Sequence, residues 1–156
     1  MSLHSLIELK NELGTMPSAE LVNICLRLAK YKKENKELLD YILFDSNYEP
    51  EYIDRIKNEM DRLFAEINRN TLYFAKKNTR KILRTVNRFI KYSGQKRTEV
   101  ELLIYFCIKL KQTGLPLHSG TALGNIFDGQ MLKIDKAILM LHEDLQHDYN
   151  EEIKWI

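Results

Sequence analysis

The sequence has few residues that crosslink the chain or interrupt regular structure. Six glycines and three prolines in 156 residues leave few positions at which a helix or strand must end. The two cysteines, Cys25 and Cys107, are too few for the dense disulfide framework of small secreted domains. Both lie in apolar runs, and we expect both to be buried, reduced thiols.

Long apolar runs are also missing. No uncharged apolar run approaches the roughly 20 residues that a membrane-spanning helix requires. The first eleven residues include Glu8 and lack an apolar core of signal-peptide length. We therefore expect a cytoplasmic protein with no membrane partner.

Acidic residues are absent from one long segment of the chain. No Asp or Glu occurs between Glu66 and Glu99, whereas ten basic residues do. They are Arg69, Lys76, Lys77, Arg80, Lys81, Arg84, Arg88, Lys91, Lys96 and Arg97. The whole chain has 24 basic and 22 acidic residues, so this segment carries +10 and the remainder carries −8. The two signs of charge are therefore segregated along the sequence.

Helical periodicity dominates what is present. Apolar residues make up 44% and charged residues 29%, a balance typical of a globular domain rather than a disordered chain. After a short first helix that Gly14 closes, apolar residues recur at three- and four-residue steps in segment after segment. The long segments are 18–33, 36–44, 50–67, 71–92, 98–113 and 130–149. We predict an all-α fold of about six helices in a single domain over residues 1–156.

Several residues predict where these helices begin and end. Pro50 suits a first helical turn, and Gly94 suits a helix end. Thr98 and Glu101 have the spacing of a capping box, which predicts a helix that begins at residue 98. This helix is apolar nearly all round, so we expect it at the centre of the fold. Four glycines between residues 114 and 129 predict a loop of about sixteen residues there.

The long segments can be paired as antiparallel hairpins, and two of them are faintly similar. The sequence Cys-Leu-Arg-Leu at residues 25–28 matches Cys-Ile-Lys-Leu at residues 107–110. Stacked hairpins with internal similarity resemble a short HEAT-like α-solenoid. An irregular helical bundle is the alternative.

The segment 71–92 carries the candidate binding residues. At about 100° per residue, its apolar residues fill one arc of the helix and its basic residues fill a largely opposite arc, with Tyr73 among them. The predicted contact residues are Tyr73, Lys76, Lys77, Arg80, Lys81, Arg84, Arg88, Lys91, Lys96 and Arg97. We expect a non-catalytic module whose basic helix contacts a nucleic-acid backbone, with Tyr73 available to stack on an unpaired base.

Two alternatives stay open for this helix. Its cations can be balanced by acidic residues of the neighbouring helix or of the C-terminal turns, or they can bind an acidic protein. The runner-up function is therefore a scaffold or homo-oligomer in which acidic segments pair with the basic helix.

No pattern in the sequence points to catalysis, a metal or a cofactor. His142 and His147 are five residues apart, which does not match the H-E-x-x-H spacing that places two rings on one face. The segment 120–124 lacks the Gly-Lys-Ser/Thr ending and the preceding strand of a phosphate-binding loop. We therefore expect no cofactor, and an enzyme stays open only through clusters that a sequence cannot show.

Overall fold

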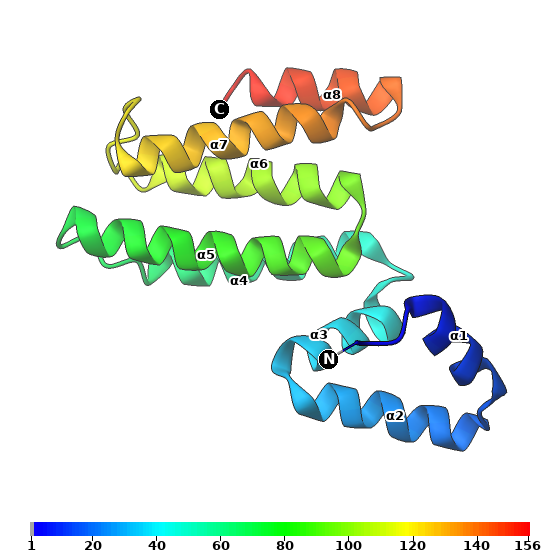
Figure 1. Ribbon diagram of the computed structural model, residues 1–156. Coiled ribbons are helices and arrows are strands. Elements are labelled where there is room, and N and C mark those ends of the chain that lie inside the picture. Colours follow the sequence, from blue (N-terminus) through cyan, green and yellow to red (C-terminus); the bar gives the residue numbers. More distant parts are fainter. Residues whose placement is uncertain (1) are drawn as a thin grey trace. The chain divides into compact units, whose positions relative to one another are not determined.

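The computed structural model describes residues 2–156. Within this range the chain forms eight α-helices and one π-helical segment, and no strand (Figure 1). The all-α prediction is confirmed, with eight helices in place of the expected six. The chain divides into two compact units, Met1–Phe44 and Asp45–Ile156. Each is described here by itself, and the single domain over residues 1–156 stays a prediction.

The first unit contains three helices, α1 (Leu6–Thr15), α2 (Ser18–Tyr31) and α3 (Lys33–Asp40). The π-helical segment Tyr41–Asp45 follows α3. A capping box begins α1, because the Ser5 hydroxyl accepts from the Glu8 amide at 3.3 Å and the Glu8 carboxylate accepts from the Ser5 amide at 2.7 Å. Helices α2 and α3 pack together.

The second unit contains α4 (Glu49–Ala65), α5 (Leu72–Ser93), α6 (Lys96–Gln112), α7 (Ala122–Ile138) and α8 (Glu143–Ile153). Consecutive helices of this unit run antiparallel (Figure 1). Helix α6 packs against α4, α5 and α7, and α8 packs against α7. The unit is therefore built from two hairpins, α4 with α5 and α6 with α7, and a final helix.

The core of the second unit surrounds α6. Eight residues of this helix are buried, and Leu102, Leu103, Phe106 and Leu110 are completely so. The Phe106 ring lies against the Phe64 ring of α4, with centroids 5.6 Å apart. A helix that is apolar nearly all round is stable in water only where neighbours cover every side. The predicted central position of this helix is confirmed.

The loop predicted over 114–129 is present but shorter, because it ends at Thr121. Helix α7 begins at Ala122, because the Thr121 hydroxyl caps it by accepting from the Gly124 amide at 3.0 Å. Gly124 lies inside this helix, where a Cβ atom would lie 2.0 Å from the carbonyl oxygen of His118. Gly124 therefore permits a close approach between two backbone segments, and the glycine count gave the wrong length for the loop.

Two further boundaries differ from the prediction. The last helix is divided, since α7 ends at Ile138 and α8 begins at Glu143 after the cap residue His142. Helix α6 begins at Lys96, so Thr98 and Glu101 do not form its capping box. Thr98 is instead buried in the helix, and its hydroxyl donates to the Glu49 carboxylate of α4 at 2.6 Å.

Candidate nucleic-acid interface

Helix α5 has well-defined ends at the positions that its sequence predicts. The Thr71 hydroxyl accepts from the Phe74 amide at 3.2 Å and begins the helix. Gly94 ends it in the left-handed conformation, at φ 65°, which few other residues adopt without strain. The predicted range of 71–92 therefore matches the observed Leu72–Ser93 to within one residue.

One face of α5 is anchored in the core of the second unit. Ala75, Thr79, Ile82 and Val86 recur every three to four residues and are between 0% and 3% exposed. Thr79 is a polar member of this row, and its hydroxyl is satisfied by donating to the Ala75 carbonyl at 2.8 Å. With this row directed inward, the opposite side of the helix faces away from the core.

The outward side carries the predicted basic residues. Lys77, Arg80, Lys81, Arg84 and Lys91 are exposed, whereas Lys76 and Arg88 are half-buried. From Lys76 to Lys91 these side chains extend over about 22 Å, at 1.5 Å per residue. We call Lys76, Lys77, Arg80, Lys81, Arg84 and Lys91 the basic face of α5.

No carboxylate in the described part of the chain pairs with the basic face. Among residues 2–156, no Asp or Glu side chain lies within 4.0 Å of any of its six cationic groups. Like charges four residues apart, such as Arg80 and Arg84, repel one another along the helix. The face is therefore a row of like charges on a helix whose other side is anchored in the core.

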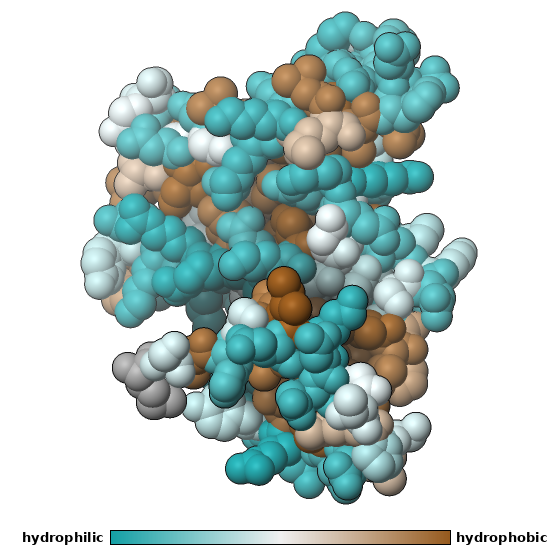
Figure 2. All heavy atoms as spheres, turned by 45° about the vertical axis from the view of Figure 1, so that its right-hand side comes forward, coloured by the Kyte–Doolittle hydropathy of each residue, from teal (hydrophilic) through white to brown (hydrophobic). Residues whose placement is uncertain are grey.

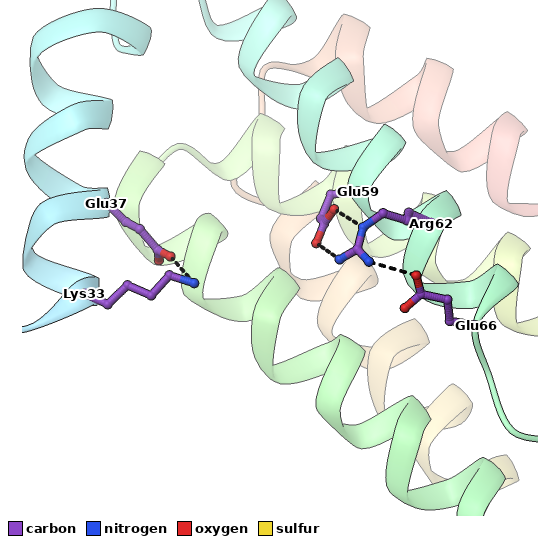
Figure 3. Close-up of polar contacts among 5 residues, drawn as sticks. All are labelled: Lys33, Glu37, Glu59, Arg62 and Glu66. Atoms are coloured by element: carbon purple, nitrogen blue, oxygen red, sulfur yellow. Dashed lines mark hydrogen bonds and ion pairs between the residues drawn. The ribbon is translucent and has the colours of Figure 1, made fainter.

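Three carboxylates in and just after α4, those of Glu59, Asp61 and Glu66, pair with cations outside α5. Figure 3 shows the Arg62 guanidinium held between Glu59 and Glu66, at 2.7 Å and 2.9 Å. Asp61 pairs with Lys109 of α6 at 2.9 Å, and this hydrogen bond is the main cause that lowers the pKa of Asp61. These carboxylates therefore pair with Arg62 of α4 and with Lys109 of α6. None of these pairs involves α5, although α4 packs against it.

Lys96 and Arg97, the last two predicted contact residues, are set apart from the basic face. They lie in the first turn of α6 and pair within that helix, Lys96 with Glu99 at 2.6 Å and Arg97 with Glu101 at 3.0 Å. Glu101 also accepts from the Tyr149 hydroxyl of α8 at 2.9 Å. The structure thus separates the six residues of the basic face from a paired group on α6.

Tyr73 borders a small groove at the beginning of α5. The groove has a volume of about 260 Å³ and lies between α5 and the chain that leads into α7. Its lining residues are Leu72, Tyr73, Lys76, Pro116, Thr121, Ala122 and Leu123. The Tyr73 ring is largely exposed, and the Lys76 ammonium lies 5.9 Å from its centroid.

The sequence could not show this groove. Its second wall comes from residues 116–123, which lie more than forty positions after Tyr73 and fall in the segment predicted as a loop. No periodic pattern links the two walls, since they meet only when the α6–α7 hairpin folds back onto α5. The groove adds an apolar, aromatic-lined recess to one end of the basic face.

Other candidate sites find no support in the described part of the chain. Between residues 2 and 156, no three His, Cys, Asp or Glu side chains gather as metal ligands would. His142 and His147 are both exposed, and the ring of His142 caps α8 by accepting from the Asp144 amide at 3.4 Å. None of the helices over this range is long and apolar enough to cross a membrane.

No protein-family model, curated protein or solved structure matches the chain. The HEAT-like arrangement of its hairpins therefore stays a prediction. The function is inferred from the geometry and the charges of α5 and of the groove beside it.

Proposed function

We propose that the chain is a non-catalytic module that binds nucleic acid through the basic face of α5. The observation that carries this proposal is the row of six cations that no carboxylate of the described chain neutralises. A phosphate backbone presents regularly spaced negative charges, and a straight cationic strip of about 22 Å can follow several of them. Binding would break no existing ion pair of these six residues.

The groove beside Tyr73 favours single-stranded over double-stranded nucleic acid. An unpaired base can leave the stack and lie against an exposed aromatic ring, whereas a base in a duplex cannot. The groove is smaller than a typical drug-sized pocket, which suits one planar base better than a larger ligand. Lys76 lines the same groove and can contact the phosphate next to that base.

The test is the salt dependence of binding to short single-stranded and duplex DNA and RNA, measured by fluorescence anisotropy. Six phosphate contacts on a single strand predict a slope of about −4 in a plot of log affinity against log salt. Arg84→Gln removes one exposed cation of the basic face and is expected to weaken binding and to reduce this slope by about 1. The matched control is Arg62→Gln, which removes the same charge from a guanidinium already held by two carboxylates.

Three results would contradict the proposal. The first is failure of the wild-type chain to bind any of these nucleic acids at about 50 mM salt, where electrostatic binding is strong. The second is equal loss of binding in the Arg84→Gln and Arg62→Gln variants, since this would assign the effect to net charge rather than to α5. The third is an unchanged salt slope in Arg84→Gln.

Tyr73 is tested separately from the cations. Tyr73→Leu retains an apolar side chain but removes the stacking ring, which contributes about 1–3 kcal/mol per stacked base. We expect it to weaken binding to single strands and to leave duplex binding unchanged. Equal affinities of wild type and variant for single strands would refute the role of the groove and leave the backbone contact of α5 intact.

A second candidate is an acidic protein surface, including one on another copy of the chain. Helix α8 favours it, because this helix carries several exposed carboxylates with few cations beside them. They include Glu143, Asp144, Asp148, Glu151 and Glu152. Self-association that salt weakens and that Arg84→Gln reduces, without binding to nucleic acid, would support this candidate instead.

A further inference from the structure

The first unit leaves an unusual amount of apolar surface uncovered. Among the described residues 2–44, Tyr41 alone is buried, and helices α1, α2 and α3 contain no buried residue. Thirteen large apolar side chains of this unit are between 37% and 84% exposed. They are Leu3, Leu6, Ile7, Leu9, Leu13, Val22, Leu26, Leu28, Tyr31, Leu38, Ile42, Leu43 and Phe44.

This surface is too extensive for a unit that stands alone in water. Figure 2 shows apolar side chains, in brown, reaching the surface among hydrophilic ones. The thirteen side chains expose on the order of 1,000 Å², more than the roughly 800 Å² that each partner contributes to a standard protein interface. A unit of 44 residues is also near the size below which oligomerisation or crosslinks commonly supply the missing stability.

The exposed apolar side chains of this unit include a ridge and a groove. Leu6 and Ile7 lie in the first turn of α1 and Leu3 lies in the chain just before it, and these three side chains, between 73% and 84% exposed, are called the α1 ridge. The capping box at Ser5 holds the first turn of this ridge in a fixed conformation. A groove of about 280 Å³ lies between α2 and α3, and its apolar lining includes Cys25, Leu28, Ala29, Leu38 and Ile42.

The groove offers little to a polar or charged ligand. Asn35 is the one amide in its lining, and its Nδ2 already donates to the Leu28 carbonyl at 2.8 Å. An amphipathic helix can fill such a groove with apolar side chains spaced three and four residues apart. Leu6 and Ile7 are the two residues of the ridge that lie on α1, since Leu3 precedes the cap residue Ser5.

We propose that the first unit is a homodimerisation surface on which the α1 ridge of one copy occupies the α2–α3 groove of a second copy, and the reverse. This proposal does not depend on the proposed nucleic-acid binding. Two-fold symmetry requires each copy to carry both halves of the contact, and the ridge and the groove are both present in one unit. The unit also contains six basic and six acidic residues, so two copies meet without net repulsion.

The first experiment measures the mass of the intact chain by light scattering and by sedimentation over a wide range of concentrations. We expect a dimer that added salt leaves intact, because the contact is apolar. Leu6→Lys in the ridge is expected to raise the dimer dissociation constant at least ~100-fold, since each dimer loses two apolar anchors. Glu12→Gln on the opposite side of α1 is the matched control, because it changes the net charge by the same +1. It is expected to leave the dimer unchanged.

Mixing two variants tests the exchange of ridge and groove. Leu28→Lys places a charge in the groove and, like Leu6→Lys, is expected to be monomeric by itself. In a mixture, the intact ridge of Leu28→Lys can occupy the intact groove of Leu6→Lys. We expect a mixed dimer with one of the two contacts restored. Circular dichroism spectra equal to those of the wild type show that both exposed-site variants are folded.

Cys25 supplies a measurement that needs no variant. It is exposed and lines the groove, whereas Cys107 is fully buried in the core of the second unit. A thiol reagent therefore reports on the groove alone, and its rate of reaction with Cys25 is expected to fall as the protein concentration rises and the groove becomes occupied.

Two outcomes would overturn the proposal. One is a monomer at every concentration together with a Cys25 reaction rate that does not change, which would leave the groove without a second copy. The other is a dimer that salt dissociates and that Leu6→Lys does not weaken, which would assign the contact to charged residues elsewhere in the chain. Both outcomes are independent of whether α5 binds nucleic acid.

Discussion

Replacing Gly124 with alanine tests the packing of α7 against the chain that precedes it. In an open helix this substitution stabilises a protein by about 0.5–1 kcal/mol, because alanine loses less backbone entropy on folding. At position 124 the added Cβ would lie 2.0 Å from the His118 oxygen, 2.8 Å from its carbonyl carbon and 3.0 Å from the Leu117 oxygen. All three atoms are backbone, so no side-chain rotation can relieve the overlap.

We expect Gly124→Ala to lower the free energy of unfolding, because the chain at residues 117 and 118 must move away. Overpacking of this kind costs about 1–3 kcal/mol, which exceeds the gain in helix propensity. The measurement is urea unfolding followed by circular dichroism. Gly129→Ala is the matched control in the same helix, since nothing lies within 4 Å of its added Cβ, and it is expected to stabilise by about 0.5–1 kcal/mol. A Gly124→Ala variant as stable as the wild type would refute the argument that glycine is required here for the close approach of the two backbone segments.

Three further predictions concern buried groups of the second unit. Thr98→Val removes the hydroxyl that donates to Glu49 and is expected to lower the free energy of unfolding by about 1–2 kcal/mol, while Thr98→Ser retains most of it. Burial is the largest single influence on Glu101 and opposes its ionisation, but hydrogen bonds and nearby cations together lower the pKa of this carboxyl. A carboxyl whose pKa is lowered on folding stabilises the fold above the ordinary pKa of glutamate, and this stabilisation is lost as the pH falls through the pKa of the folded state. We therefore expect the difference in unfolding free energy between wild type and Glu101→Gln to shrink on acidification. Burial raises the pKa of Cys107 to about 12, so a thiol reagent is expected to modify only Cys25 in the folded protein and to find a second thiol after unfolding.

The sequence predicted helix α5 well because its signals are local. Seven apolar residues on one arc, basic residues on the other, Thr71 before it and Gly94 after it all lie within one segment. The exposed basic face follows from the same periodicity, since burying one arc of a helix turns the other toward solvent. What the sequence left open was whether α4 neutralises this face, because the pairing of Asp61 with Lys109 depends on how α4 and α6 pack.

The errors arose where a residue has a tertiary rather than a local role. Glycine usually marks a turn, but Gly124 provides room for the His118 backbone inside a helix. Thr98 and Glu101 have the spacing of a capping box, but both side chains form hydrogen bonds with other helices, Thr98 with Glu49 of α4 and Glu101 with Tyr149 of α8. The prediction that both cysteines are buried holds for Cys107 and is wrong for Cys25, because the apolar face of α2 is only partly covered.

The basic face of α5 has a cost for stability that can be measured apart from binding. Arg84 has an arginine four residues to either side, Arg80 and Arg88, and each such pair of like charges destabilises a helix by about 0.2–0.5 kcal/mol. The buried row from Ala75 to Val86 anchors α5 in the core and offsets part of this repulsion. Arg84→Glu turns both repulsions into attractions and is expected to raise the free energy of unfolding by about 1–2 kcal/mol while it weakens nucleic-acid binding. A less stable Arg84→Glu variant would show that the arginine already has a stabilising partner, and the argument that this face is kept for an external ligand would fail.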